Sequence, residues 1–229
     1  MPCPKDYSRV DITGRAYAGS QRQIQTYVNE RAGVLNTEVA QSLSKYQVDL
    51  REMRWTSPLS NDSYSEYRDA EFLERVGLSM YASQLIGFWP SGGPCWDALA
   101  RTEDGCILIE AKSHVDEIRS SGCKASSTQS RKKIMAALAA TKTWLGVPED
   151  FDWAGPLYQS ANRYAFLYFL REIARVPAFL VTIYFVGDPH PNPARPTSQK
   201  DWDTAIKRVN VALGLVREVP YSAAVFLPV

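Results

Sequence analysis

The sequence predicts an α/β protein in which a mixed central β-sheet is flanked by helices. Two runs of alternating residues, 96–101 and 106–112, enclose a turn-forming segment and are typical of a β-hairpin. The apolar, β-branched run 178–188 is typical of a strand that is buried on both faces. Helical patterns precede and follow these strands. This order of elements is that of an α/β sandwich.

Before the hairpin, the chain is expected to be mostly helical. Residues 1–19 are polar, contain Pro and Gly, and predict an extended segment. Apolar residues recur with the helical period over 20–46, where two helices with a break near Gly33 are expected. A further helix is expected over 64–77, with N-cap candidates at 61–63.

The length of the chain predicts one domain with a decorated N-terminus. Its 229 residues are enough to bury a proper core. We divide it into an N-terminal extension, residues 1–63, and a core domain, residues 64–229. The extension is expected to be largely helical and to pack on the core domain.

After the hairpin, helices and strands alternate along the chain. Gly and Pro mark the loops, and Ser198 is the N-cap candidate of the last helix. The pattern predicts loops over 115–128 and 188–198, helices over 129–145, 157–174 and 199–214, and strands over 178–188 and 222–227.

The register of the hairpin follows if residues 102–105 form its loop. Gly105 ends this loop at the usual place for a positive φ. Directly opposed residues lie roughly 4.5–5.5 Å apart at Cβ. The opposed pairs are then Arg101 with Cys106, Leu99 with Leu108 and Asp97 with Glu110.

Alternation along the two strands separates the side chains of the hairpin onto two faces. One face carries Asp97, Glu110 and Lys112, so that two carboxylates lie beside one cation. A bulge of one residue would turn Asp97 away from this face. The other is a core face, formed by the apolar residues Trp96, Ala98, Ala100, Ile107, Ile109 and Ala111.

An Asp on one strand followed by Glu-x-Lys on the next resembles the PD-(D/E)XK nuclease superfamily. Asp97 matches the Asp, Trp96 stands where Pro is frequent, and residues 110–112 match Glu-x-Lys. The order of elements is also compatible with the αβββαβ core of this restriction-endonuclease-like fold. The resemblance implies a metal-dependent nuclease that hydrolyses phosphodiester bonds in DNA, in preference to RNA.

The resemblance also implies how these residues would act. Asp97 and Glu110 would hold Mg²⁺ or Mn²⁺, which take oxygen ligands. The metal would generate a hydroxide, and Lys112 would position or deprotonate the water or neutralise charge on the phosphate. The alternative is that Glu110 and Lys112 form the solvated face of an amphipathic strand, where surface ion pairs are common.

Two helices are expected to add residues to this site. Glu74, chosen over Glu66 and Glu71 because it lies nearest the end of the helix at 64–77, would be a third metal ligand. Gln159 would fix the water or a phosphate, as a Gln near the start of the later helix does in several PD-(D/E)XK groups. Arg163 lies one turn further along the same helical face. The alternatives are a solvated helix face for the glutamates and a capping role for Gln159 and Arg163.

A nucleic-acid partner requires a local basic patch, because the net charge of the chain is only +1. Arg131, Lys132 and Lys133 form a basic run that is placed to follow a phosphate backbone, with Arg163 as a further contact. The alternative is a solvated helix surface, because Ile134 begins the opposite, apolar face.

Several other functions are excluded by what the sequence lacks. It has no Gly-rich phosphate-binding or dinucleotide-binding motif and no Ser nucleophile elbow. Two histidines do not make a His-rich zinc site. No apolar run approaches the roughly 20 residues that a membrane span needs.

The N-terminus and the cysteines favour the cytoplasm as the location. Residues 1–11 lack the apolar core of a signal peptide. The four cysteines form no metal-binding pattern. A bridge between Cys95 and Cys106 is conceivable, but buried or free thiols in a reducing compartment are the simpler interpretation.

The sequence therefore predicts a cytoplasmic Mg²⁺-dependent nuclease that binds DNA, with a homodimer or a partner protein supplying specificity. The rival hypothesis is a non-catalytic module on the same fold that binds nucleic acid or protein. A third is a metal-dependent hydrolase of a small phosphorylated substrate.

Overall fold

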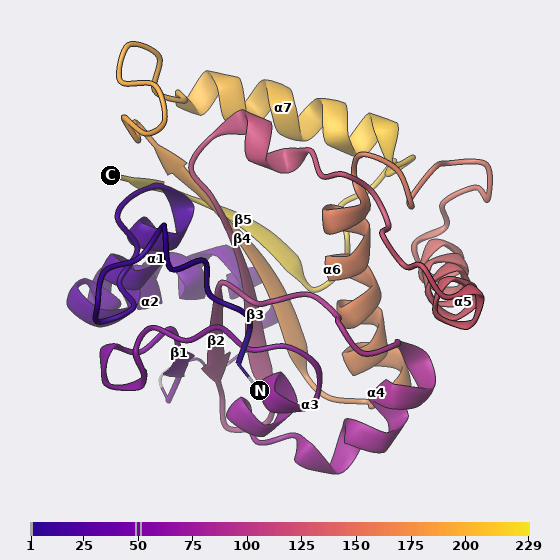
Figure 1. Ribbon diagram of the computed structural model, residues 1–229. Coiled ribbons are helices and arrows are strands. Elements are labelled where there is room, and N and C mark those ends of the chain that lie inside the picture. Colours follow the sequence, from indigo (N-terminus) through magenta and orange to yellow (C-terminus); the bar gives the residue numbers. More distant parts are fainter. Residues whose placement is uncertain (1, 49, 51) are drawn as a thin grey trace.

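The computed structural model describes residues 2–48, 50 and 52–229, and its centre is one five-stranded mixed sheet (Figure 1). The strands run in the order β1-β2-β3-β4-β5, so neighbours in the chain are neighbours in the sheet. The pairs β1–β2 and β2–β3 are antiparallel, whereas β3–β4 and β4–β5 are parallel. The α/β class with a mixed sheet is thus confirmed. The strands are β1 (Arg54–Ser57), β2 (Ala98–Arg101), β3 (Cys106–Lys112), β4 (Ala178–Val186) and β5 (Ser222–Pro228).

Helices cover both faces of this sheet and enclose two apolar cores. Helices α1 (Gly19–Glu30) and α2 (Ala32–Ser42) pack on one face, against side chains such as Ile107 and Val181. The other face carries further helices, and its core includes Phe72, Leu108 and Phe166. These helices are α3 (Asp69–Arg75), α4 (Ala82–Phe88), α5 (Thr128–Leu145) and α6 (Tyr158–Tyr168), while α7 (Gln199–Ala212) crosses one end of the sheet (Figure 1).

The predicted helices and strands after the hairpin are confirmed, and side-chain caps explain where two helices begin. Ser127 Oγ accepts a hydrogen bond from the Ser130 amide at the start of α5. Ser198 and Asp201 form a reciprocal capping box at the start of α7. Short turns complete the chain: η1 (Ser44–Tyr46), η2 (Ser60–Asp62), η3 (Ser79–Tyr81), η4 (Val115–Ile118) and the π-helical turn η5 (Phe169–Ile173), which continues α6.

Two expectations for the N-terminal part need correction. The helix predicted over 64–77 begins only at Asp69, because Ser63 and Tyr64 adopt positive φ angles of 50° and 54° that end the preceding turn. Strand β1 is short and lies at the sheet edge, where no alternating pattern reveals it. The segment 1–63 therefore supplies a strand of the sheet as well as two helices.

The predicted hairpin register is confirmed, with Arg101 opposite Cys106 and Leu99 opposite Leu108. The expectation that Trp96 shares a face with Ala98 is wrong, because its ring packs with Phe72 and Phe166 on the other side of the sheet. Both hairpin faces are covered because β3 is the middle strand. The positive φ expected at Gly105 is also wrong. Glycine is needed there for space instead, because a Cβ would lie 1.7 Å from the carbonyl oxygen of Pro177.

Two of the cysteines form a disulfide that was not predicted. Cys3 is bonded to Cys95, 92 residues away, whereas Cys106 is buried with a free thiol and Cys123 is also free. The conceivable bridge between Cys95 and Cys106 is therefore wrong. Among the described residues, no helix is both long and apolar enough to span a bilayer.

Candidate functional site

Strand β3 and helix α6 bring three of the predicted site residues into direct contact. Glu110 and Lys112 are on the same face of β3, and Gln159 lies in the first turn of α6. Lys112 Nζ is 2.5 Å from Glu110 Oε1 and donates to Gln159 Oε1 at 3.1 Å. Gln159 Nε2 donates to the same Glu110 oxygen at 2.8 Å. Glu110 and Lys112 are buried, so the alternative of a solvated strand face is wrong.

Arg163 completes the environment of Glu110 from the next turn of α6. Its Nε donates to Glu110 Oε2 at 2.5 Å, and its Nη2 donates to the carbonyl oxygen of Cys95 at 2.8 Å. The guanidinium also lies 4.9 Å from the centre of the Trp96 ring. Only 5% of Arg163 is exposed, and its contact with nucleic acid stays a prediction.

Asp97 joins the group from the residue directly before β2. Its Oδ2 accepts a hydrogen bond from the Ala111 amide at 2.7 Å, which ties the carboxylate to β3 beside Glu110. Burial raises the pKa of Asp97 well above its usual value, and the negative charges of Glu110 and Glu66 raise it further. The hairpin therefore brings two carboxylates together, as the register predicted.

Glu66 is the third carboxylate of this cluster, in place of the expected Glu74. Its side chain accepts a hydrogen bond from Gln21 Nε2 at 3.0 Å. Burial is the main cause that raises the pKa of Glu66 to about 7, and the Gln21 hydrogen bond opposes it. Glu74 is exposed and lines a different hollow with Glu71 and Arg75.

The sequence offers Glu66 as a candidate but favours Glu74, because the expected helix spans both and Glu74 is nearer its end, whereas in the structure Glu66 precedes the helix. Tyr67 forms an isolated bridge with Trp96, and this pairing holds its neighbour Glu66 beside Asp97. No helical period could show that relation. The only local signal for Glu66 is that it directly precedes an aromatic residue, Tyr67. That pattern is too common to identify a site residue by itself.

The charges of the cluster divide it into a paired part and an unpaired part. Burial by itself raises the pKa of Glu110, but the positive charges of Arg163 and Lys112 outweigh it and leave that pKa below its usual value. Burial lowers the pKa of Lys112, and the charges of Glu110 and Asp97 more than compensate. Glu110 and Lys112 are therefore ionised, whereas burial and neighbouring negative charge favour the protonated forms of Asp97 and Glu66.

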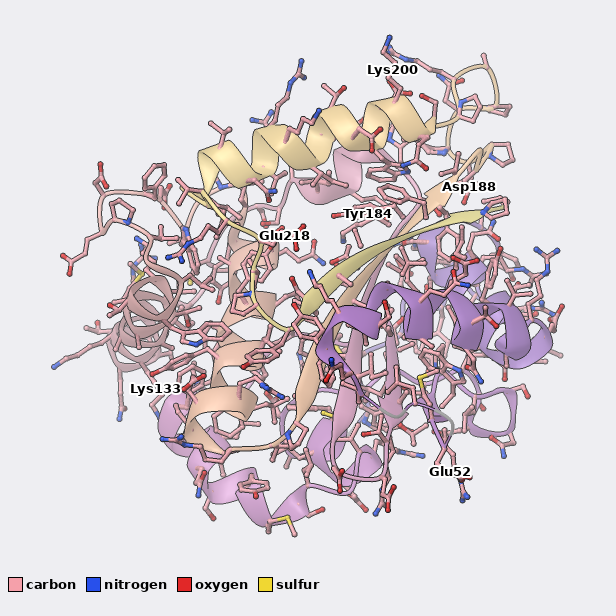
Figure 2. All side chains as sticks on the ribbon, turned by 180° about the vertical axis from the view of Figure 1, so that it is seen from behind. Glu52, Lys133, Tyr184, Asp188, Lys200 and Glu218 are labelled. Atoms are coloured by element: carbon pink, nitrogen blue, oxygen red, sulfur yellow. A yellow bond between two sulfur atoms is a disulfide. The ribbon has the colours of Figure 1, made fainter. Side chains whose placement is uncertain are left out.

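Two cavities meet at this cluster. The first, which we call the acid cavity, has a volume of about 640 Å³ and is lined by Glu66, Asp97 and residues of the N-terminal segment. The second, the rear cavity, has a volume of about 430 Å³, lies between α6, α7 and the sheet, and is lined by Glu110 and Arg163. Lys112 and Gln159 line both cavities. Tyr184 and Glu218, labelled in Figure 2, lie at the rear cavity.

The acid cavity contains donors that fit a divalent cation. In the described part of the chain, no group of three or more Asp, Glu, His or Cys side chains is arranged to hold a metal by itself. Mg²⁺ is usually bound through one or two carboxylates, with water and substrate phosphate completing its shell. Asp97 and Glu66 provide two such oxygens. Burial is the main cause of their raised pKa values and the negative charge of nearby carboxylates adds to it, so a bound cation would favour their ionised forms.

The predicted basic run lies apart from both cavities. Arg131 and Lys132 are exposed on the first turns of α5, and Lys133 Nζ donates to the carbonyl oxygen of Ile86 at 2.7 Å. None of the three is among the described residues that line either cavity. The structure does not bring this run to the acidic cluster, and its contact with nucleic acid stays a prediction.

The raised pKa of Glu66 predicts a pH-dependent difference between the protein and its Glu66→Gln variant. The pKa is 4.5 in an unfolded chain and about 7 in the fold, so the folded state binds more protons between these values. The free energy of unfolding of the wild type should therefore fall, relative to the variant, by up to roughly 3 kcal/mol as the pH rises from 4.5 to 7. Urea unfolding in EDTA measures this, and a pH-independent difference would contradict it.

The arrangement joins a carboxylate pair, a buried lysine and a glutamine at the wall of one cavity. Such a group can bind a cation beside a positively charged side chain, and it can polarise an oxyanion such as a phosphate. Comparison of this chain with protein families, curated proteins and solved structures found no match. Function is therefore argued from the geometry of the site.

Proposed function

We propose that this protein is a metal-dependent nuclease with a restriction-endonuclease-like fold, which hydrolyses phosphodiester bonds in DNA in preference to RNA. One observation carries the proposal: Asp97, Glu110, Lys112 and Gln159, named from the Asp and Glu-x-Lys pattern and the later helix, converge in three dimensions. Lys112 and Gln159 line the acid cavity together with Asp97 and Glu66. A buried lysine beside an acidic pair fits phosphate chemistry.

Asp97 and Glu66 would hold Mg²⁺ or Mn²⁺, which supplies a Lewis acid and an activated water when bound. Lys112 keeps its positive charge through Glu110 and lines the same cavity, where it would neutralise charge on the phosphate. Gln159 fixes the direction of that amine through its Oε1. In this proposal Glu110 positions Lys112, with Arg163 holding its second oxygen, instead of serving as the main metal ligand.

A specific observation favours the second candidate, a non-catalytic binding module. Both oxygens of Glu110 are already engaged by Lys112, Gln159 and Arg163. An ion-pair network of this kind can serve the fold alone, because buried charges require partners. Under this candidate the acid cavity neither binds a divalent cation nor supports cleavage.

The test is cleavage of labelled single-stranded and double-stranded DNA and RNA with Mg²⁺ or Mn²⁺, with EDTA as the blank. We expect metal-dependent cleavage of DNA that falls about a hundredfold or more in Asp97→Asn. Asp188→Asn is the matched control, because Asp188 is also a buried carboxylate that accepts a backbone amide hydrogen bond, from His190 at 2.9 Å. Asp188 is labelled in Figure 2.

Calorimetric titration with Mg²⁺ or Mn²⁺ separates the two candidates. Metal binding that is lost in Asp97→Asn and kept in Asp188→Asn supports the nuclease. A folded wild-type protein that neither binds the metal nor cuts any substrate would overturn the nuclease proposal and favour the binding module.

A further inference from the structure

Residues 3–17 lead from the acid cavity to a small hairpin on the surface. Val10 and Ala16 form its antiparallel bridge, and the Tyr17 amide donates to the Arg9 carbonyl oxygen at 3.0 Å. Val10 and Ala16 are buried, with 5% and 2% of their surfaces exposed. Because adjacent residues of a strand alternate between faces, Arg9 and Tyr17 lie opposite one another on the outward face.

This segment, residues 3–17, which we call the N-terminal arm, is fixed at both ends. The disulfide joins Cys3 to Cys95, and the Cys3 amide donates to the Glu66 carbonyl oxygen at 2.8 Å. At the other end, the Ala16 amide donates to Gln25 Oε1 of α1 at 2.8 Å. The arm is therefore an ordered surface that is attached directly beside a carboxylate of the site.

The arm exposes three large apolar side chains for which the fold provides no cover. The exposed fractions are 82% for Tyr7, 105% for Ile12 and 66% for Tyr17. Two of the three are aromatic and present flat rings to solvent. Exposed apolar side chains gathered on one ordered segment are typical of an interaction surface.

The charges of the arm indicate which partner this surface fits. Lys5 and Arg9 line the acid cavity together with Glu66 and Asp97, so cations lead from the tyrosines to the carboxylates. Asp6 also lines this cavity, but its Oδ1 accepts hydrogen bonds from Ser8, at 3.0 Å from the amide and 2.6 Å from Oγ. Aromatic rings on which bases stack, beside cations that contact phosphates, are the recurrent elements of single-strand binding.

We propose that the N-terminal arm binds single-stranded nucleic acid and delivers it to the acid cavity. Tyr7 and Tyr17 stack on unpaired bases, while Arg9 and Lys5 contact the backbone. Duplex DNA presents its bases only by their edges, so it cannot occupy both rings. The inference rests on the proposed function, because that function is the reason for a nucleic-acid strand to be led to the acid cavity. It adds that the substrate class is single-stranded nucleic acid.

The test measures binding of a fluorescein-labelled oligothymidylate to the full chain in EDTA, by fluorescence anisotropy. We expect the Tyr7→Ala/Tyr17→Ala variant to bind about thirtyfold more weakly or worse, because it loses the rings on which two bases stack. The Tyr7→Phe/Tyr17→Phe variant keeps both rings and should bind like the wild type. Arg9→Gln should weaken binding and reduce the slope of log affinity against log salt by about 0.7.

The control variant is Ile86→Ala, which shortens an exposed apolar side chain on α4, 67% exposed, outside the arm. It should leave the affinity unchanged. Equal affinity of the wild type and the Tyr→Ala variant would overturn the inference. So would equal binding of the matching duplex, or absence of binding to any strand.

Cleavage assays on the same variants separate this inference from the proposed function. Metal-dependent cleavage of single strands that the Tyr→Ala variant retains in full would overturn the arm as a substrate surface and leave the nuclease standing. Tyrosine-dependent binding without any cleavage by the wild type would overturn the nuclease and support the arm as a single-strand surface.

Discussion

Lys112→Met is expected to lower metal-dependent cleavage by about a hundredfold or more while the protein stays folded. Methionine has a similar length and fits a buried site, so the packing of β3 against α6 is retained. The substitution removes the cation whose Nζ lies 2.5 Å from Glu110 Oε1, on a side chain that lines the acid cavity. Gel assays of cleavage at saturating Mg²⁺ measure the loss.

Lys142→Met is the matched control for this prediction. Lys142 is 9% exposed, as Lys112 is, but its Nζ donates to the carbonyl oxygens of Glu149 and Phe151 at 2.8 and 2.5 Å. Loss of this lysine should lower stability and leave cleavage at a permissive temperature near the wild-type rate. If Lys112→Met cuts as fast as Lys142→Met, Lys112 has no part in catalysis.

Arg163→Met is expected to lower the free energy of unfolding by about 3–5 kcal/mol, the cost of breaking a buried ion pair from one side. The variant leaves Glu110 Oε2 and the Cys95 carbonyl without the donors that are 2.5 and 2.8 Å away in the wild type. Urea denaturation at neutral pH measures this loss. A loss below about 1 kcal/mol would contradict the assigned role.

The pH dependence of this loss has a defined sign. Arg163 helps to hold the pKa of Glu110 below 4.5, its usual value, so the pair stabilises the fold above that pH and the contribution disappears as the pH falls. The difference between the wild type and Arg163→Met should therefore be largest at neutral pH and smaller in acid.

A double variant distinguishes the ion pair from lost packing. The Arg163→Met/Glu110→Gln variant leaves no buried carboxylate without its guanidinium, because residue 110 is then a neutral amide. Its loss of stability should therefore be smaller than the sum of the losses in the two single variants. Strict additivity would mean that the effect of Arg163 comes from its stem and its contact with Trp96.

Local patterns in the sequence were sufficient to predict the hairpin and most elements after it. The alternation over 96–101 and 106–112 fixed which side chains share a face, and the four-residue loop fixed the register, because both depend on neighbours along the chain. Asp97, Glu110 and Lys112 could be grouped for the same reason. The start of α7 could be predicted in the same way, since both residues of its capping box, Ser198 and Asp201, lie within four positions of the chain.

Tertiary structure alone decided the remainder of the site. Glu66, Arg163 and the partner of Cys3 were fixed by contacts between segments far apart in the chain, and no local period encodes such contacts. The same holds for the protonation of the cluster, because a pKa depends on burial and on charges that only folding brings near. The sequence thus determined which side chains each strand presents, whereas three-dimensional packing determined which of them meet and which charge each carries.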